Sequence, residues 1–221
     1  MTRPVDPHHR GVVIFRWCIF LLAAGFVIRQ LVLDGDYSET GGPFRYLTNW
    51  ALLLSFFCAS RMLALSERRS SREWETLVSV TAVVNVIMVG LYWAIKFDDP
   101  ANLNTGRALP FWADYYLHLI GPLLQWIDAV FVHGAFRRQG QISIWLIGTI
   151  SVYLAFIELI VAPNAEFPYG AVTSGLPYPF LNNMLLIDRF WFYISATVAA
   201  FVALAVFAVI ANVYRRRRTR R

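Results

Sequence analysis

Long apolar stretches alternate with short polar segments along the 221 residues of the chain. A helix needs about 20 residues to cross a hydrocarbon core of roughly 30 Å, and each stretch is near or above that length. The stretches do not alternate as barrel strands do, so the pattern predicts helices. We place the spans at residues 11–33, 44–65, 74–97, 109–136, 142–161 and 187–214. The pattern therefore predicts an all-α polytopic membrane protein with six transmembrane helices in one bundle.

Composition and charge support a membrane protein with a defined orientation. Hydrophobic residues make up 57% of the chain against 15% charged residues, and the net charge is +6. If the amino terminus is cytoplasmic, fifteen of the twenty Lys and Arg residues fall in cytoplasmic segments, which the positive-inside rule favours. These are Arg3, Arg10, Arg16, Arg61, Arg68, Arg69, Arg72, Arg137, Arg138 and six arginines of the basic tail, residues 215–221. We predict cytoplasmic termini and a tail that anchors to lipid headgroups rather than to nucleic acid.

The remaining five basic residues, and the longer loops, belong to the opposite side of the bundle. Those residues are Arg29, Arg45, Lys96, Arg107 and Arg189. The loops at residues 34–43, 98–110 and 162–183 are rich in turn formers, and longer loops are where a site is commonly built. No low-complexity linker or internal repeat divides the chain, so residues 1–221 are predicted to form a single domain with any site on its outer side.

Polar residues inside the predicted spans gather at one depth. Thr48 and Asn49 lie about one turn into the second span, and Asp114 and His118 lie one to two turns into the fourth. Glu158 lies near the outer end of the fifth span. Ionisable groups within a membrane are costly and usually face the bundle interior. We expect these residues to approach one another in the outer leaflet.

The fourth span carries a histidine that has two interpretations. Asp114 and His118 are four residues apart, so they share a helix face and the carboxylate can orient the imidazole. Pro122 leaves the carbonyl of His118 without its helical partner, which predicts a kink. His118 is either a hydrogen-bonded residue at this kink or a catalytic base. Asp128 lies too deep to join it, and a role in helix packing is expected.

Thr48 also has two interpretations. A threonine in a membrane helix ordinarily donates to the carbonyl one turn back. The alternative is a nucleophile, which needs a base within hydrogen-bond reach because a hydroxyl is too weakly acidic to attack an ester unaided. His118 can supply that base if the second and fourth helices pack together. Spacing alone does not decide between the two.

Three short motifs carry a resemblance to a known family. They are RYLT at residues 45–48, LHLIGP at residues 117–122 and PYPFL at residues 177–181. Together with the chain length and number of helices, they resemble the androgen-induced-gene family of membrane proteins, which includes the androgen-dependent regulator of tissue factor pathway inhibitor. The order of motifs is similar to that of the bacterial branch. The resemblance covers essentially the whole chain.

The resemblance implies an activity. Animal members are intramembrane hydrolases of fatty acid esters of hydroxy fatty acids, with a threonine nucleophile and a histidine base. The threonine of that family follows a Tyr-Leu motif, which Thr48 matches, and its histidine follows a tryptophan by six residues, as His118 follows Trp112. The chain departs from animal members at Asp114 and Tyr115, where they carry Asn and His. Asn49 and Trp50 also replace a more apolar continuation.

The resemblance also suggests roles for neighbouring residues. Asp114 would orient His118, while Asn49, Tyr46 or a backbone N–H would stabilise the oxyanion. Arg29 and Arg45 would hold a substrate carboxylate, or would extend to lipid headgroups instead. Glu158 is a further candidate for substrate binding, and the ester's acyl chain would lie among apolar side chains of the bundle.

Two other classes of function remain open. A small transporter or proton-coupled carrier would use Asp114, His118 and Glu158 as a relay, and a non-catalytic protein would keep the fold only to bind lipid. We expect no metal, since no zinc pattern is present, and no nucleotide cofactor. The 19 arginines against one lysine suggest a GC-rich bacterial genome and hence the cytoplasmic (inner) membrane. The sequence leaves the oligomeric state open.

Overall fold

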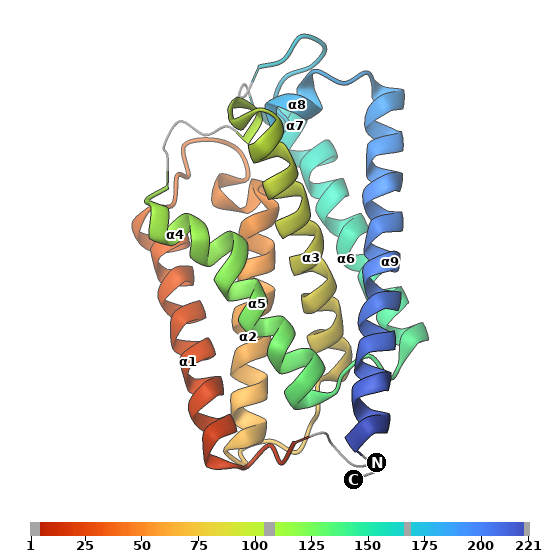
Figure 1. The fold of residues 1–221 in the computed structure, drawn as a ribbon. Helices are drawn as coiled ribbons and strands as arrows, with labels where there is room; N and C mark the ends of the chain where they lie inside the picture. Colours follow the sequence, from red (N-terminus) through yellow and green to blue (C-terminus); the bar gives the residue numbers. More distant parts are fainter. Residues whose placement is uncertain (1–4, 104–108, 166–168, 219–221) are drawn as a thin grey trace.

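The computed structural model describes residues 5–103, 109–165 and 169–218, and within these ranges the regular structure is helical apart from one isolated bridge between Tyr169 and Ser174 (Figure 1). The α-helices are α1 (Arg10–Val27), α2 (Leu47–Ser66), α3 (Glu75–Asp98), α4 (Phe111–Tyr115), α5 (Gly121–Ile127), α6 (Gln139–Phe156), α7 (Ala162–Asn164), α8 (Pro179–Asn182) and α9 (Leu186–Arg218). Four segments are π-helical: η1 (Ile28–Leu33), η4 (Tyr116–Ile120), η5 (Asp128–His133) and η6 (Ile157–Val161). The 3₁₀ helices are η2 (Gly42–Arg45) and η3 (Pro100–Leu103).

Among the described residues, five helices are long and apolar enough to cross a membrane. They are Arg10–Leu33, Leu47–Ser66, Glu75–Asp98, Gln139–Asn164 and Leu186–Arg217. These five match predicted spans, although the second starts at Leu47 because Tyr46 is extended, with φ −95° and ψ 130°. The remaining predicted span, residues 109–136, is a succession of α4, η4, α5 and η5. The apolar helices mark the chain as an integral membrane protein.

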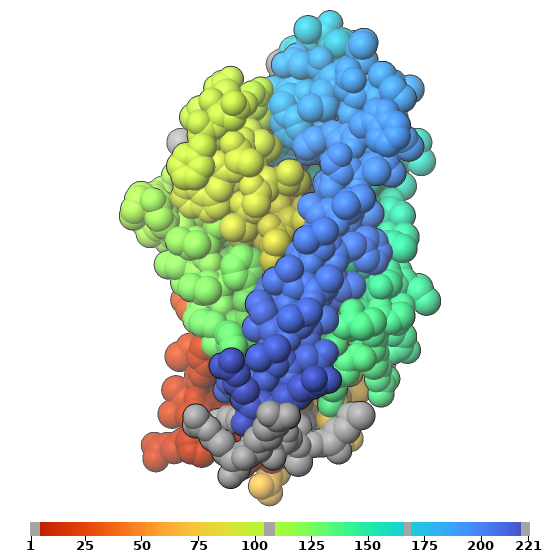
Figure 2. All heavy atoms as spheres, turned by 45° about the vertical axis from the view of Figure 1, so that its right-hand side comes forward, coloured from red at the N-terminus to blue at the C-terminus, as the bar shows by residue number. Residues whose placement is uncertain are grey.

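Helix α3 lies at the centre of the bundle. It contacts α2, α5, α6 and α9, and its residues Val78, Ala82 and Val83 have no exposed surface. Helix α1 packs against α2, and the α4–η5 stretch crosses in front of both α2 and α3 in the view of Figure 1. Figure 2 shows α9 running the height of the molecule, with α3 and the α4–η5 stretch on one side and α6 on the other. This central position brings α3 into contact with helices on both sides of the bundle.

The two ends of the bundle differ in what they carry. The chain termini and the 67–74 and 134–138 connections lie at one end, here called the terminal end, whereas the longer loops lie at the other, the long-loop end (Figure 1). At the terminal end Arg215 donates to the carbonyls of Gly134 and Ala135 at 2.7 and 2.9 Å. Residues 215–218, which were predicted to belong to a basic tail, are the last residues of α9. Arg3, Arg107 and residues 219–221 fall outside the described residues.

The structure corrects the predicted position of Arg16. Its charge suggests a cytoplasmic position, yet its exposure is only 1% and it lies inside α1. Its Nε donates to Asp128 of η5 at 2.9 Å, and its Nη1 donates to Ser66 Oγ of α2, also at 2.9 Å. An arginine this deep is tolerated because a carboxylate neutralises it and fixed oxygens accept its protons. Arg16 thus joins three helical segments, and its bond to Asp128 agrees with the packing role expected for that aspartate.

Candidate functional site: a Thr48–His118 pair above an apolar pocket

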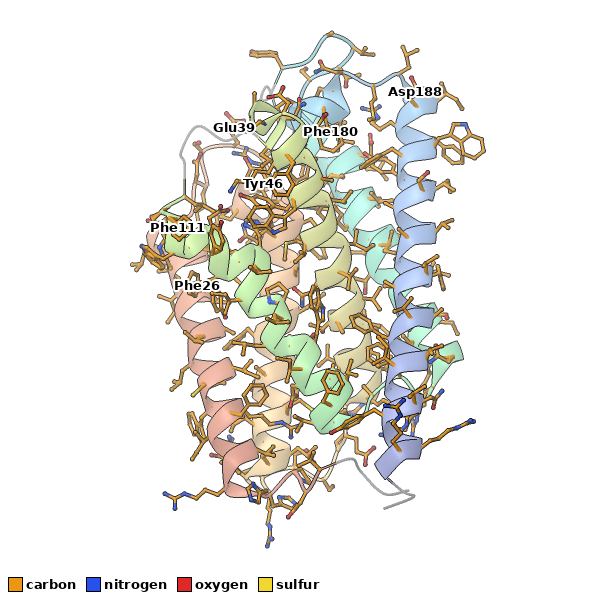
Figure 3. The ribbon with its side chains drawn as sticks, in the orientation of Figure 1. Phe26, Glu39, Tyr46, Phe111, Phe180 and Asp188 are labelled. Atoms are coloured by element: carbon orange, nitrogen blue, oxygen red, sulfur yellow. The ribbon has the colours of Figure 1, made fainter. Side chains whose placement is uncertain are left out.

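A pocket of about 1310 Å³ occupies the half of the bundle nearer the long-loop end. Glu39, Tyr46 and Phe180 line it near the loops (Figure 3), and Val84 and Ala200 line its deepest part. Along α3 the lining extends from Lys96 to Val84, which is about 18 Å of helical rise. The lining is mixed near the loops and apolar at depth. Its dimensions suit a molecule with a polar end and a long apolar chain.

Thr48 lies in the first turn of α2, directly after a tight turn. Gly41 and Gly42 have φ of +83° and +47°, and a Cβ on Gly41 would come within 2.8 Å of Val161 Cγ2. Glycine is therefore required for the chain to reverse before Pro43. No side chain of α2 itself caps its start, but the N–H of Leu47 donates to the hydroxyl of Tyr178 at 3.1 Å. Tyr178 belongs to the PYPFL motif, so this motif holds the start of the threonine helix.

The turn before Thr48 is fixed by side chains from two directions. Asn49 Nδ2 donates to the carbonyl of Pro43 and Trp50 Nε1 to that of Phe44, each at 2.6 Å. From α6, the hydroxyl of Tyr153 donates to the carbonyl of Arg45 at 3.1 Å. Asn49 and Trp50 thus hold the backbone of this turn. The bond to Pro43 uses one of the two amide hydrogens of Asn49, and the oxyanion role suggested for this residue stays a prediction.

Tyr178 is partly buried beside this turn, and desolvation raises the pKa of its hydroxyl to about 12. The hydroxyl therefore stays protonated near neutral pH and remains an acceptor for the Leu47 N–H. Tyr46, which the sequence suggested as an oxyanion donor, lines the pocket and packs edge-to-face on Tyr178 with ring centroids 5.9 Å apart.

His118 lies in η4, just before the proline that predicted a kink. The N–H of Gly121 bonds to the carbonyl of Tyr116, five residues back, so the chain widens into a π turn instead of continuing as an α-helix. The carbonyl of His118, which Pro122 cannot serve, accepts a hydrogen bond from the indole of Trp93 on α3 at 2.8 Å. Pro122 thus leaves this carbonyl without a helical donor, as the sequence indicated, and the bond from Trp93 attaches His118 to α3.

Thr48 and His118 are brought together. Thr48 Oγ1 and His118 Nε2 lie 3.2 Å apart, and both residues line the pocket. On the other side of the ring, His118 Nδ1 lies 3.0 Å from Asp114 Oδ1. An ionised carboxylate only accepts, so Nδ1 carries a proton, and in the neutral ring Nε2 then presents its lone pair to the threonine hydroxyl. The arrangement has the order of a nucleophile, a base and an orienting acid.

Helix α3 contributes two residues that sequence reasoning did not assign to the site. Tyr92 and Lys96 both bond to the carboxylate of Asp114, and Lys96 Nζ also lies 3.1 Å from the hydroxyl of Tyr92. The Tyr92 ring stacks on the imidazole of His118, with centroids 3.4 Å apart and planes 4° apart. A signal was present in the sequence, since a tyrosine and the chain's one lysine occur four residues apart near the end of an apolar helix.

The two arginines proposed to bind substrate both line the pocket near the loops. Arg45 is 9% exposed, and its Nε and Nη1 have no hydrogen-bond partner among the described residues. Its nearest carboxylate is Asp36, with Nη2 4.0 Å from Oδ2. Hydrogen bonds from Ser38 hold the pKa of the Asp36 carboxyl below its ordinary value, so it stays charged. Arg29 is paired with Asp34 at 2.8 Å but keeps a buried unpartnered Nη1.

Glu158 lies apart from this group. It accepts a hydrogen bond from Tyr193 at 2.6 Å, lies 3.4 Å from Arg189 Nε, and does not line the pocket. The predicted convergence therefore holds for Thr48, Asp114 and His118 but not for Glu158, which links η6 to α9. Among the described residues, no group of three His, Cys, Asp or Glu side chains is placed to hold a metal ion.

Comparison with known proteins identifies the family. The model for FAR-17a/AIG1-like proteins matches residues 11–212, nearly the whole chain. The chain belongs to the FAR-17a/AIG1-like family. This confirms the resemblance drawn from the RYLT, LHLIGP and PYPFL motifs. No curated protein sequence and no solved structure gives a significant match.

Membership gives each family motif a place in the geometry described above. RYLT supplies the nucleophile candidate, LHLIGP supplies its neighbouring imidazole, and PYPFL supplies the hydroxyl that caps α2. Three motifs that are far apart in the sequence thus meet around one pocket. In chemical terms, the arrangement provides a hydroxyl that faces an imidazole, a carboxylate beside that imidazole and a guanidinium with two donors that have no partner among the described residues.

Proposed function

We propose that the protein is an intramembrane hydrolase that cleaves lipid esters through Thr48 and His118. The observation that carries the proposal is the 3.2 Å contact between Thr48 Oγ1 and His118 Nε2 inside a pocket long enough for an acyl chain. A structural threonine would donate to its own helix, whereas this hydroxyl faces a base whose other nitrogen is held by Asp114. Family membership supports the same reading.

The proposed reaction proceeds in two halves. His118 Nε2 takes the Oγ1 proton as Thr48 attacks the ester carbonyl carbon, and the resulting imidazolium then gives that proton to the departing alkoxide. The product is an acyl-threonine and a free alcohol. His118 next takes a proton from a water molecule, which attacks the acyl carbon, and Thr48 Oγ1 regains the proton as the acid leaves. No cofactor takes part in either half.

A developing oxyanion needs donors, and the geometry changes which candidate is favoured. Asn49 donates to Pro43, and the Leu47 N–H donates to Tyr178. The N–H groups of a helix's first turn have no acceptor within the helix, and Thr48 lies in that turn. We therefore assign the oxyanion to the backbone N–H of Thr48, with the Tyr46 hydroxyl as the second candidate.

The lipid substrate would lie with its acyl chain between α3, α6 and α9 and with any carboxylate near Arg45. The deep lining of Val84, Leu146 and Ala200 is apolar. Arg45 offers Nε and Nη1, two donors in the fixed geometry that suits a carboxylate. A fatty acid ester of a hydroxy fatty acid has both features, which makes it the substrate class that fits the pocket.

For the membrane arrangement, we propose that residues 111–133 form a sixth span and that both termini are cytoplasmic. The α4–η5 stretch is continuous and roughly 30 Å long by helical rise. With six spans the termini share one side, and the arginines of the terminal end favour the cytoplasm. In this orientation the pocket opens in the outer leaflet of the membrane. For a bacterial protein, that membrane is the cytoplasmic (inner) membrane. Maleimide labelling of Ser38→Cys from outside intact cells, but not of Arg138→Cys, would test this orientation.

The function is tested with purified full-length protein in detergent. Ester hydrolysis and fluorophosphonate labelling are measured for the wild type, Thr48→Ala and His118→Ala, with the exposed Ser195→Ala and His9→Ala as matched controls. We expect both site variants to lose hydrolysis and labelling while thermal unfolding is unchanged. Retained hydrolysis in Thr48→Ala overturns the proposed nucleophile. Substrate counterflow in liposomes without labelling would indicate a carrier, and lipid binding without either activity would indicate a non-catalytic protein.

A further inference from the structure

Helix α3 holds the proposed base from three directions. The Tyr92 ring covers one face of the His118 imidazole, the Trp93 indole donates to its carbonyl, and Lys96 bonds to the carboxylate of Asp114 beside it. A purely structural histidine would be satisfied by Asp114 and its own helix. The additional contacts require an explanation, and the charge of Lys96 provides one.

The charges around the imidazole are balanced by Lys96. A lone carboxylate within hydrogen-bond distance stabilises the imidazolium, which has no lone pair and cannot act as a base. Lys96 bonds to Oδ2 of the same carboxylate whose Oδ1 faces His118. The pair of Asp114 and Lys96 has no net charge, so Asp114 can orient the ring without keeping it protonated at rest. The side chain of Lys96 is 32% exposed, so water screens part of this effect.

We propose that Lys96 and Tyr92 are positioning residues, with Lys96 setting the pH at which His118 becomes a base and Tyr92 fixing the plane of its ring. This inference rests on the proposed hydrolase function. It assigns to α3 a part in the reaction that neither the family motifs nor the Thr48–His118 contact implies. Lys96 acts through the carboxylate of Asp114 and Tyr92 through the plane of the imidazole ring, and neither residue makes or breaks a bond in the proposed reaction.

Other charged groups near the pocket differ from Lys96 in their position. The ionisable side chains that also line the pocket are Arg29, Asp34, Asp36, Glu39, Arg45, Tyr46, Tyr153, Tyr178 and Tyr193. Among the described residues, Asp114 and His118 bond to each other, and the other side chains that bond to or stack on them are those of Thr48, Tyr92 and Lys96. A change at Lys96 therefore acts on the base more directly than a change at any of those other groups.

The experiment measures hydrolysis and the rate of fluorophosphonate labelling at Thr48 as functions of pH. For Lys96→Met we expect the acid limb of both profiles to move upward by about one pH unit, with a roughly tenfold loss at neutral pH, because Asp114 is then uncompensated. Lys96→Arg keeps the charge and should restore the position of the limb. Tyr92→Leu, which removes the stacked ring, should lower the rate with a smaller shift than Lys96→Met, whereas Tyr92→Phe keeps the ring and should retain more activity.

The results separate this inference from the proposed function. An unchanged acid limb in Lys96→Met, or an equal shift in Lys96→Arg, overturns the role of Lys96 even if Thr48→Ala remains inactive. If the wild type shows no hydrolysis, the proposed function fails instead. The titration of the His118 imidazole, followed by ¹⁵N NMR in detergent and assigned with His118→Gln, then still tests the same shift without turnover.

Discussion

Two buried aspartates on the α4–η5 stretch have different surroundings. Asp114 is bonded to Tyr92, Lys96 and His118, and these residues line a pocket of about 1310 Å³. Asp128 is paired with Arg16 beside a void of only about 10 Å³. The first cluster leaves an imidazole nitrogen facing a hydroxyl, whereas the second uses Arg16 to join helices. A buried charge therefore becomes a candidate for chemistry when its partners leave a reactive atom facing a cavity.

The largest expected effect is at Asp114. Asp114→Asn keeps the shape but removes the charge that fixes the His118 tautomer, so hydrolysis should fall by about 10³- to 10⁴-fold. Thermal unfolding should change little in comparison, because the other residues of the pocket remain. The exposed Asp98→Asn is the matched control and should retain full activity. Activity within about threefold of the wild type would contradict the orienting role.

Arg16 should show the opposite pattern. Arg16→Met leaves Asp128 as a buried uncompensated charge, which costs about 3–5 kcal/mol in the free energy of unfolding. Hydrolysis per folded molecule should be unchanged, since the pair lies away from the pocket. Denaturant unfolding in mixed micelles measures the loss, with the exposed Arg10→Met as control. A stable variant with impaired turnover would remove the contrast between the two clusters.

The depth of the pocket should set which acyl chains are accepted. Ala200→Phe fills the deepest part, so hydrolysis of long-chain esters should fall about tenfold or more while that of short-chain esters is retained. The matched control is Val198→Phe, because Val198 belongs to the same helix and is 56% exposed. The ratio of kcat/KM for long and short p-nitrophenyl esters gives the result. Equal losses for both lengths would place the acyl chain elsewhere.

The smallest effect is expected at the cap of α2. Tyr178→Phe removes the acceptor for the Leu47 N–H and should cost about 1 kcal/mol in stability, with a modest loss of activity from a less fixed Thr48. Tyr115→Phe is the control, because the Tyr115 hydroxyl has no hydrogen-bond partner among the described residues. Unfolding temperature and kcat are the two measurements. No change in either would mean that water replaces the hydroxyl.

Much of the fold could be predicted from hydrophobic run lengths, because a bilayer imposes a fixed length on each helix. The π-helical segments η1, η4, η5 and η6 were not predicted, since π turns depend on local packing that hydropathy does not report. Pro122, in contrast, did indicate that the α-helix is interrupted at η4. Arg16 was misplaced because its charge is visible in the sequence, whereas its partner Asp128 is 112 residues away.

The candidate site was partly predictable for a related reason. Asp114 and His118 are four residues apart, so helical geometry alone brings them together, and the family motifs singled out Thr48. Tyr92 and Lys96 reach the same carboxylate through tertiary packing of α3, which the spacing of residues does not encode. Glu158 shares the expected depth with the site but lies toward α9, because depth along a helix does not specify direction around it.

The separation of Thr48 and His118 by 70 residues has a consequence for biogenesis. During synthesis, the threonine helix enters the membrane well before the helix that carries its base has been translated. A nascent or truncated chain that contains only the first three helices would therefore hold an ordinary hydroxyl among lipid esters. Under the proposed function, reactivity begins only when the histidine helix docks against α2 and α3, so the completion of assembly itself protects the surrounding membrane from premature cleavage.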